Sequence, residues 1–299
     1  MNTFLKNLGF GKNDRVVIIH ADDVGMCQAT IPAFAELIEF GLLSSGAVMV
    51  PCPWFLEAAA YCRQSPTADM GVHLTLTSEW KTYRWGPIST SDPSTGLFDE
   101  EGYFRHRAHQ TQGHGDPHAV QLELKAQFER ALAAGIDVTH IDTHMGTLAH
   151  PKFIPAYIQL SQQHKIPAMI PTDGENDLQE LGLDSETAAN AARFIKEEVD
   201  TRKLLQIDRV IGLRLDRPQE RLEQVKTAFD SLQPGLTHFV IHPATDTPEL
   251  RAATPTTWEC RVKDYETFQS EELRTYIQNL DIQIIGYKPF RELIQKQEK

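Results

Sequence analysis

Cysteine and long apolar runs are scarce in this 299-residue chain. None of its four cysteines lies in a CxxC pair: Cys27, Cys52, Cys62 and Cys260. So sparse a set excludes a disulfide-stapled secreted fold and predicts free thiols. No window approaches the roughly 18 apolar residues of a membrane span, and charges and glycines interrupt the first residues where a signal peptide needs an apolar stretch. We therefore expect a cytoplasmic protein with no membrane partner.

Basic residues are also in deficit, with 29 Lys and Arg against 41 Asp and Glu and a formal charge of −12. Binding to nucleic acid or to an anionic membrane needs basic patches, so this balance argues against both kinds of partner. Hydrophobic residues make up 41% of the chain, which is enough for a sizeable core. Because no linker or repeat divides the sequence, we expect a single domain over residues 1–299.

Short β-rich apolar runs alternate with amphipathic segments of helix length, which predicts an α/β fold with a parallel sheet. A GxGxxG turn is missing after the first run. Eight strands favour a (β/α) barrel, complete or distorted, over an open doubly wound sheet. They are expected over residues 15–20, 47–50, 70–76, 138–143, 167–170, 209–213, 238–241 and 283–285.

The clearest helix is predicted over residues 117–134, where Asp116 can cap the first turn and Gly135 follows the last. Further helices are expected over 29–40 and 218–232. Residues 77–116 break the pattern, because they are rich in Ser, Pro, Gly, His and aromatics and show little periodicity. We expect an inserted loop that serves as a lid or binding wall, although a plain surface insertion explains it about as well.

Histidines and aspartates gather at the predicted carboxyl ends of the strands, where barrel active sites form. His140, Asp142 and His144 have equal parity and therefore project to one face of their strand. Core histidines bonded to carbonyls would explain any one of these residues, but they explain the joint pattern on several strands poorly. The pattern predicts an active site in the mouth of the barrel.

Two histidines and one carboxylate from different strands form a divalent-metal site with positions open for water and substrate. We predict Asp23, His73 and His144 as ligands. Asp22 and Asp23 are adjacent, so their side chains should diverge, which suits them poorly as the facing carboxylate pair of a glycosidase. One can bind metal while the other acts as a base, and an acidic cap on the following helix is the alternative.

Five segments together resemble the YdjC-like, ChbG-type carbohydrate deacetylases. They occur in the family's order and span nearly the whole chain: ADDVG (21–25), GVHLT (71–75), THIDTH (139–144), IHP (241–243) and IIGYKPFR (284–291). The resemblance implies a distorted β/α barrel, a divalent metal usually described as magnesium, and removal of acetyl groups from N-acetylated carbohydrates, often by a homodimer.

Carried over by matching positions, the resemblance implies the same three metal ligands, with Asp22 as catalytic base and His242 as proton donor. Arg261 matches a later segment that orients the site. In the chitooligosaccharide deacetylases of the family, further histidines follow the last ligand, whereas Met145, Gly146 and Thr147 stand here. The resemblance therefore leaves the sugar open.

The sequence leaves alternatives for the neighbours of His144, for the role of Trp85, for the metal ion and for the function. Asp142 or His140 could orient His144 through its second ring nitrogen. Trp85, in the 77–116 loop, could stack on a sugar ring, and core packing or a dimer contact explains it about as well. Mixed imidazole and carboxylate ligation is more typical of Zn²⁺, Mn²⁺ or Co²⁺ than of Mg²⁺. Two rival hypotheses are a non-haem iron enzyme and a sugar- or metal-binding protein without catalysis.

Overall fold

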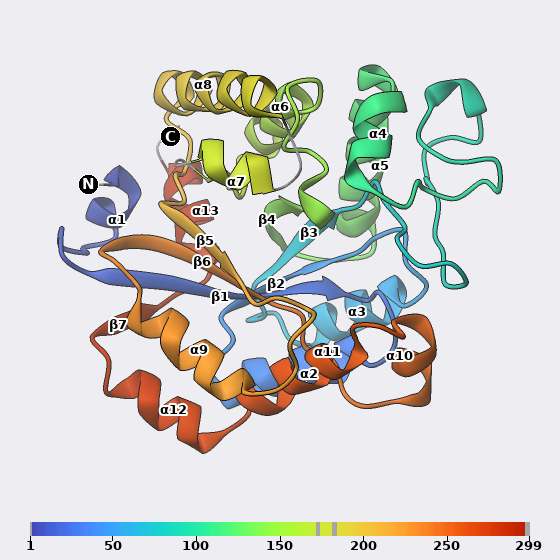
Figure 1. Cartoon of the computed structure of the whole chain (residues 1–299). Coiled ribbons are helices and arrows are strands. Elements are labelled where there is room, and N and C mark those ends of the chain that lie inside the picture. The colour runs from blue at the N-terminus through green and yellow to red at the C-terminus, as the bar shows by residue number, and fades with distance from the viewer. Residues whose placement is uncertain (1, 172–173, 181–183, 297–299) are drawn as a thin grey trace.

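The computed structural model describes residues 2–171, 174–180 and 184–296, and a parallel sheet runs through its centre (Figure 1). Within these residues the strand order is β4-β3-β2-β1-β6-β5, and β7 also pairs with β1. The strands are β1 (Arg15–Val24), β2 (Ser45–Val48), β3 (Met70–Leu74), β4 (Val138–Thr143), β5 (Arg209–Gly212), β6 (Gly235–Ile241) and β7 (Ile282–Ile284).

Helices cover the sheet on both sides (Figure 1). They are α1 (Thr3–Asn7), α2 (Thr30–Phe40), α3 (Phe55–Gln64), α4 (Ala108–His114), α5 (Pro117–Ala133), α6 (Ile154–His164), α7 (Gly174–Glu180), α8 (Ser185–Arg202), α9 (Arg221–Asp230), α10 (Pro248–Ala253), α11 (Trp258–Phe268), α12 (Glu271–Gln278) and α13 (Lys288–Lys296), with short 3-10 turns η1 (Pro93–Thr95) and η2 (His144–Gly146). This alternation confirms the α/β prediction.

The predicted strand over 167–170 is wrong as a regular strand, but its residues link the two ends of the sheet. Ile141 on β4 donates its N–H to Pro167 O at 3.0 Å, and Met169 N donates back to Ile141 O at 2.9 Å. On the other side, Ile207, just before β5, donates to Ile170 O at 3.2 Å. Single bridges thus replace a strand, and the sheet curls into a distorted barrel.

Alternation along β1 explains how the barrel is filled. Val17 and Ile19 pack in the larger hydrophobic cluster, which includes residues of α2, α3 and α5. Val16 and Ile18 point to the other face, into a smaller cluster with residues of α1 and α13. Because both faces are buried, this strand is apolar without interruption up to His20. His20, Asp22 and Asp23 then carry polar groups to the carboxyl end of the strand.

Helix boundaries follow the predicted signals closely. The Asp116 carboxylate accepts the Ala119 N–H at 2.9 Å and so caps α5. Gly41 ends α2 in the left-handed region, with φ 88°. The helix predicted over 218–232 is shorter, because it forms only over Arg221–Asp230.

Residues 77–116 form an irregular stretch that is tied firmly to the barrel. Besides η1 and α4 it holds a single antiparallel bridge between Phe98 and Phe104. The backbone N–H groups of Ile88 and Ser89 donate to the buried Glu123 carboxylate on α5. That this stretch is an insertion stays a prediction.

All four cysteines are free, as the sequence predicts, and the structure shows that all four are buried. In the described part of the chain, no helix combines the length and the apolar character that crossing a membrane requires.

Asp116→Ala should lower the free energy of unfolding by about 1 kcal/mol, because the first turn of α5 loses its side-chain cap. Asp116→Asn, which keeps an oxygen acceptor, should lose much less. Urea unfolding of the three proteins measures the difference, and equal losses in both variants would contradict the capping role.

Candidate metal centre and active site

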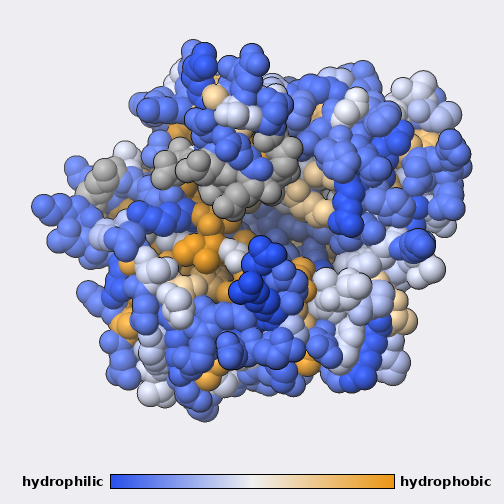
Figure 2. Space-filling model, viewed as in Figure 1, coloured by the Kyte–Doolittle hydropathy of each residue, from blue (hydrophilic) through white to orange (hydrophobic). Residues whose placement is uncertain are grey.

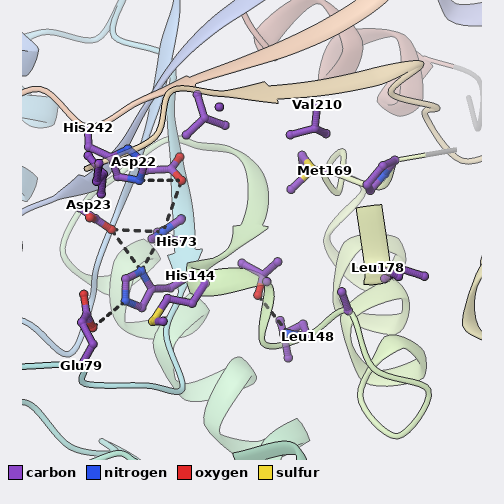
Figure 3. A pocket seen from close by; sticks show the side chains of 18 of the residues that line it. Asp22, Asp23, His73, Glu79, His144, Leu148, Met169, Leu178, Val210 and His242 are labelled. Atoms are coloured by element: carbon purple, nitrogen blue, oxygen red, sulfur yellow. Dashed lines mark hydrogen bonds and ion pairs between the residues drawn. The ribbon is translucent and has the colours of Figure 1, made fainter. Parts of the chain in front are cut away.

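A β-bulge at the end of β1 turns two consecutive carboxylates toward one cavity. Ala21 pairs with Gly46 and Val24 with Val48, so two residues on β1 oppose one on β2. Asp23 adopts φ 63°, in the left-handed region. Both carboxylates then line the same cavity (Figure 3). The expectation that these side chains diverge is wrong, because it assumed a regular strand.

Asp23, His73 and His144 present three ligand atoms at nearly equal spacing (Figure 3). Asp23 Oδ1 lies 3.4 Å from His73 Nε2 and 3.2 Å from His144 Nδ1. The two nitrogens are 3.3 Å apart. The three residues come from β1, β3 and the start of η2, so the sheet brings together the ligands that the sequence predicts.

These spacings fit a metal ion. Ligand distances of about 2.0–2.1 Å in a tetrahedral site place the ligand atoms about 3.3–3.4 Å apart. Asp23 Oδ1 is buried, yet it accepts no hydrogen bond from any described residue. A buried carboxylate oxygen without a donor is costly unless it is coordinated, so the donor set can hold a divalent metal.

The electrostatics of the site also favour a cation. Arg261 Nη2 lies 2.8 Å from Asp23 Oδ2 and is the guanidinium that contacts the site. Burial would raise the pKa of Asp23, but Arg261 and His144 hold it well below its usual range. Burial would lower the pKa of His144, but the Glu79 and Asp23 carboxylates raise it to about 9. The carboxylates thus attract positive charge to the position between the ligands.

Each ligand histidine has a carboxylate on its second ring nitrogen. Asp142 Oδ1 lies 2.8 Å from His73 Nδ1, and Glu79 Oε2 lies 3.1 Å from His144 Nε2. The expectation that Asp142 or His140 orients His144 is therefore wrong, since Asp142 holds His73 and His140 bonds elsewhere. Sequence reasoning missed Glu79, whose one signal was a carboxylate shortly after the end of β3.

Asp22 lies beside the ligands together with His242. Its Oδ2 is 3.8 Å from His73 Nε2 and 3.9 Å from His242 Nε2. Burial would raise the pKa of Asp22, but His73 and His20 hold it well below its usual range. Burial lowers the pKa of His242 to about 4. At neutral pH, Asp22 is therefore ionised and His242 neutral.

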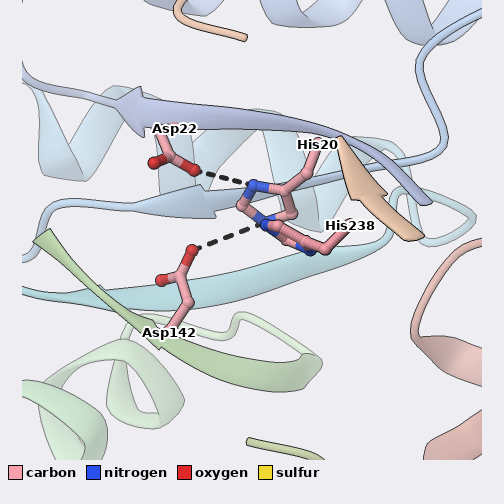
Figure 4. Close-up of side chains that lie close together, drawn as sticks. All are labelled: His20, Asp22, Asp142 and His238. Carbon is pink, nitrogen blue, oxygen red and sulfur yellow. Dashed lines mark hydrogen bonds and ion pairs between the residues drawn. The ribbon is translucent and has the colours of Figure 1, made fainter. Parts of the chain in front are cut away.

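A second group of buried side chains supports Asp22 from below: His20, Asp142 and His238 (Figure 4). His20 Nδ1 lies 2.8 Å from Asp22 Oδ1, and its Nε2 lies 2.9 Å from His140 Nε2. A carboxylate only accepts, so His20 Nδ1 carries the proton that faces Asp22. Both nitrogens of His20 are thus used, and we interpret the group as support rather than as a second metal site.

The site opens into a cavity of about 700 Å³. Figure 2 shows that this face of the molecule is hollowed and that hydrophobic side chains border the hollow. Trp80 and Arg107, from the 77–116 stretch, line the cavity. Trp85 does not, because it is 3% exposed and donates its indole N–H to Thr77 O at 2.8 Å. Within the 77–116 stretch, the aromatic residue that lines the cavity is therefore Trp80.

Comparisons with known proteins agree with the residue pattern. Residues 16–279 match the family described as YdjC-like protein. A carbohydrate deacetylase of Thermus thermophilus is 32% identical over 270 residues, which cover 90% of this chain and 92% of that protein. A carbohydrate deacetylase of Thermoanaerobacter pseudethanolicus is 25% identical over 236 residues, which cover 79% and 84%.

A solved structure from Enterococcus faecalis V583, provisionally named a cellobiose-phosphate cleavage protein, has the same fold. It superposes with a TM-score of 0.76 at 22% identity and covers 93% of this chain and 99% of that one.

Removing a ligand should abolish metal binding. His73→Ala and His144→Ala should each weaken zinc binding to metal-stripped protein by more than about 100-fold, and Asp142→Ala by about 10- to 100-fold, because it only orients a ligand. Titration calorimetry measures the affinities. His118→Ala, on the exposed face of α5, is the control. Binding that persists in both ligand variants would contradict the assigned site.

Gly71→Ala tests the support beneath the site. A Cβ at Gly71 would stand 2.4 Å from the His140 ring, which stacks on Tyr287 with centroids 3.9 Å apart and cannot retreat. We expect a loss of about 1–3 kcal/mol in the free energy of unfolding. Gly113→Ala, in α4 with nothing within 4 Å of its Cβ, is the matched control and should be neutral or stabilising. Equal effects in thermal unfolding would contradict the close packing.

Proposed function

The chain belongs to the YdjC-like family, and from this membership and the site geometry we propose that it is a metal-dependent hydrolase that removes acetyl groups from N-acetylated carbohydrates. The observation that carries the proposal is the Asp23–His73–His144 triangle with Asp22 beside it. This arrangement combines a place for a divalent ion with an ionised base in one cavity, as amide hydrolysis requires.

The chemistry that a divalent ion supplies in such a site is polarisation of the acyl carbonyl and a lower pKa of water. Asp22 is the base that takes a proton from the attacking water. His242 is neutral at the start, and its Nε2 lies 3.9 Å from Asp22 Oδ2, so the proton reaches it through one bridging water. His242 then delivers the proton to the departing nitrogen. One water is consumed, the C–N bond breaks, and acetate and a free amino sugar leave.

The surrounding residues hold these groups in place. Asp142 fixes the ring of His73, and Arg261 fixes the Asp23 carboxylate. Asp264 accepts the backbone N–H of His242 at 2.9 Å and so holds the start of the IHP segment. Trp80 offers an aromatic face to a sugar ring.

Two imidazoles and one carboxylate favour Zn²⁺, Mn²⁺ or Co²⁺, so we propose a transition metal, whereas the family resemblance implies Mg²⁺. A non-haem iron enzyme would leave Asp22 and His242 without roles, and a binder without catalysis would need neither. The homodimer and the cytoplasmic location stay predictions.

Asp22→Asn should lower the rate of acetate release by at least about 100-fold, because the amide cannot take a proton from water. The assay uses a panel of N-acetylated mono- and oligosaccharides, with Zn²⁺, Mn²⁺, Co²⁺ or Mg²⁺ returned to metal-stripped protein. Zinc affinity, measured in parallel, should change little in this variant.

The control Asp92→Asn changes an exposed carboxylate in the 77–116 stretch. Undiminished turnover in Asp22→Asn, or acetate release that persists without metal, would contradict the proposed mechanism.

A further inference from the structure

The cavity at the site has a polar part and an apolar part. Trp80, Arg107 and Thr257 line the polar part, beside the catalytic cluster. The other part, here called the apolar chamber, is lined by Leu148, Ile154, Met169, Leu178, Ile195 and Val210. These six side chains come from the segment between η2 and α6, the start of α6, the 167–171 bridge, helices α7 and α8, and β5.

Core side chains form much of the wall of the apolar chamber, and Met169 and Val210 in that wall are partly exposed. Leu148 is 1% exposed, Ile154 and Leu178 are 3% exposed, and Ile195 is 6% exposed. Such side chains offer no strong hydrogen-bond donor or acceptor. Sugar hydroxyls placed there would lose their water without gaining partners, which is unfavourable. The chamber therefore suits a hydrocarbon group, whereas the polar part suits the sugar ring.

The two parts lie on opposite sides of the cluster. In Figure 3, His242 and Glu79 lie on one side of His73 and His144, and Met169, Val210, Leu178 and Leu148 lie on the other. In the proposed function His242 faces the amide nitrogen, which carries the sugar. The acyl substituent of a carbonyl carbon held at the ligands then points the other way, toward the apolar chamber.

An acetyl group does not fill this space. Its single methyl would contact the near wall of the chamber and leave the partly exposed Met169 and Val210 without a ligand contact. A longer acyl chain would extend along Met169 and Val210 toward Leu178 (Figure 3).

We propose that the preferred substrates are N-acyl amino sugars whose acyl chain is longer than acetyl, with the chain in the apolar chamber. The inference rests on the proposed function, because it needs the carbonyl carbon at the ligands. The reaction is the same hydrolysis: the water oxygen bonds to the acyl carbon, the C–N bond breaks, and a fatty carboxylate and a free amine leave.

The test compares N-acetyl-, N-butanoyl- and N-hexanoylglucosamine with the metal-loaded enzyme, following release of the free amine. We expect kcat/KM to rise about threefold for each added methylene that the chamber buries. A further substrate, the hexyl glycoside of N-acetylglucosamine, places the same hydrocarbon on the other end of the sugar and should gain little over N-acetylglucosamine.

Two variants at Val210 report on the chamber through the ratio of hexanoyl to acetyl kcat/KM. Val210→Phe shortens the space and Val210→Thr makes its wall polar at nearly the same size, so both should lower the ratio at least about threefold. Leu122→Phe, at a 48% exposed position on α5, is the matched control and should keep the wild-type ratio.

The outcomes separate the two proposals. Acetyl hydrolysis with a flat or falling chain-length series would overturn the chamber assignment and leave the proposed function intact. A gain with the hexyl glycoside instead of the hexanoyl amide would assign the chamber to the other end of the substrate and also overturn it. Release of no amine from any substrate with any of the four metals would overturn both.

Discussion

An extra residue in β1, between Ala21 and Val24, places two consecutive carboxylates in one cavity, which a regular strand cannot do. Two hydrogen bonds hold the turn that follows the left-handed backbone at Asp23. Met26 N donates to Asp23 O at 3.1 Å, and Gly25 N donates to the Thr30 hydroxyl at 2.9 Å. Without this bulge, one of the two aspartates would face the apolar layer beneath the helices, and either the ligand or the base would be lost.

The bulge works only because the barrel interior beneath it is polar and rigid. His20 connects Asp22 to His140, and His140 stacks on Tyr287 from the closing segment of the chain. Gly71 lets the His140 ring approach the backbone of β3. The glycine of the GVHLT segment and the tyrosine of the IIGYKPFR segment therefore serve one purpose, which is to fix the buried rings that position the base. Matching segments far apart in the sequence meet at one point in the barrel.

Strand periodicity and the His and Asp pattern predicted the α/β class, most strands, the α5 cap and the three residues that meet at the candidate metal site. They failed where the structure departs from regular geometry. Period-two reasoning separated Asp22 from Asp23 because a bulge has no signature in ADDVG. The order of residues along β4 pointed Asp142 toward His144, yet register against β3 pairs it with His73. The positions of Glu79 and of Trp80, which lines the cavity where Trp85 was expected to, depend on irregular backbone. A local sequence pattern does not encode such backbone.

The chemistry of the site also bears on the stability of the fold. Asp22 and Asp142 lie beside His73, Glu79 lies beside His144, and Asp23 contacts both histidines and the Arg261 guanidinium. Buried carboxylates oppose folding unless cations offset them, and without metal Arg261 and protonated His144 are such cations. A divalent ion that binds the folded chain alone stabilises that chain by mass action, so metal affinity and folding free energy are coupled. Two of these carboxylates, Asp142 and Glu79, also hold the rings of His73 and His144, so removing their charge by substitution would loosen the two histidines. Stability without metal and tight metal binding are therefore opposing demands on these four side chains.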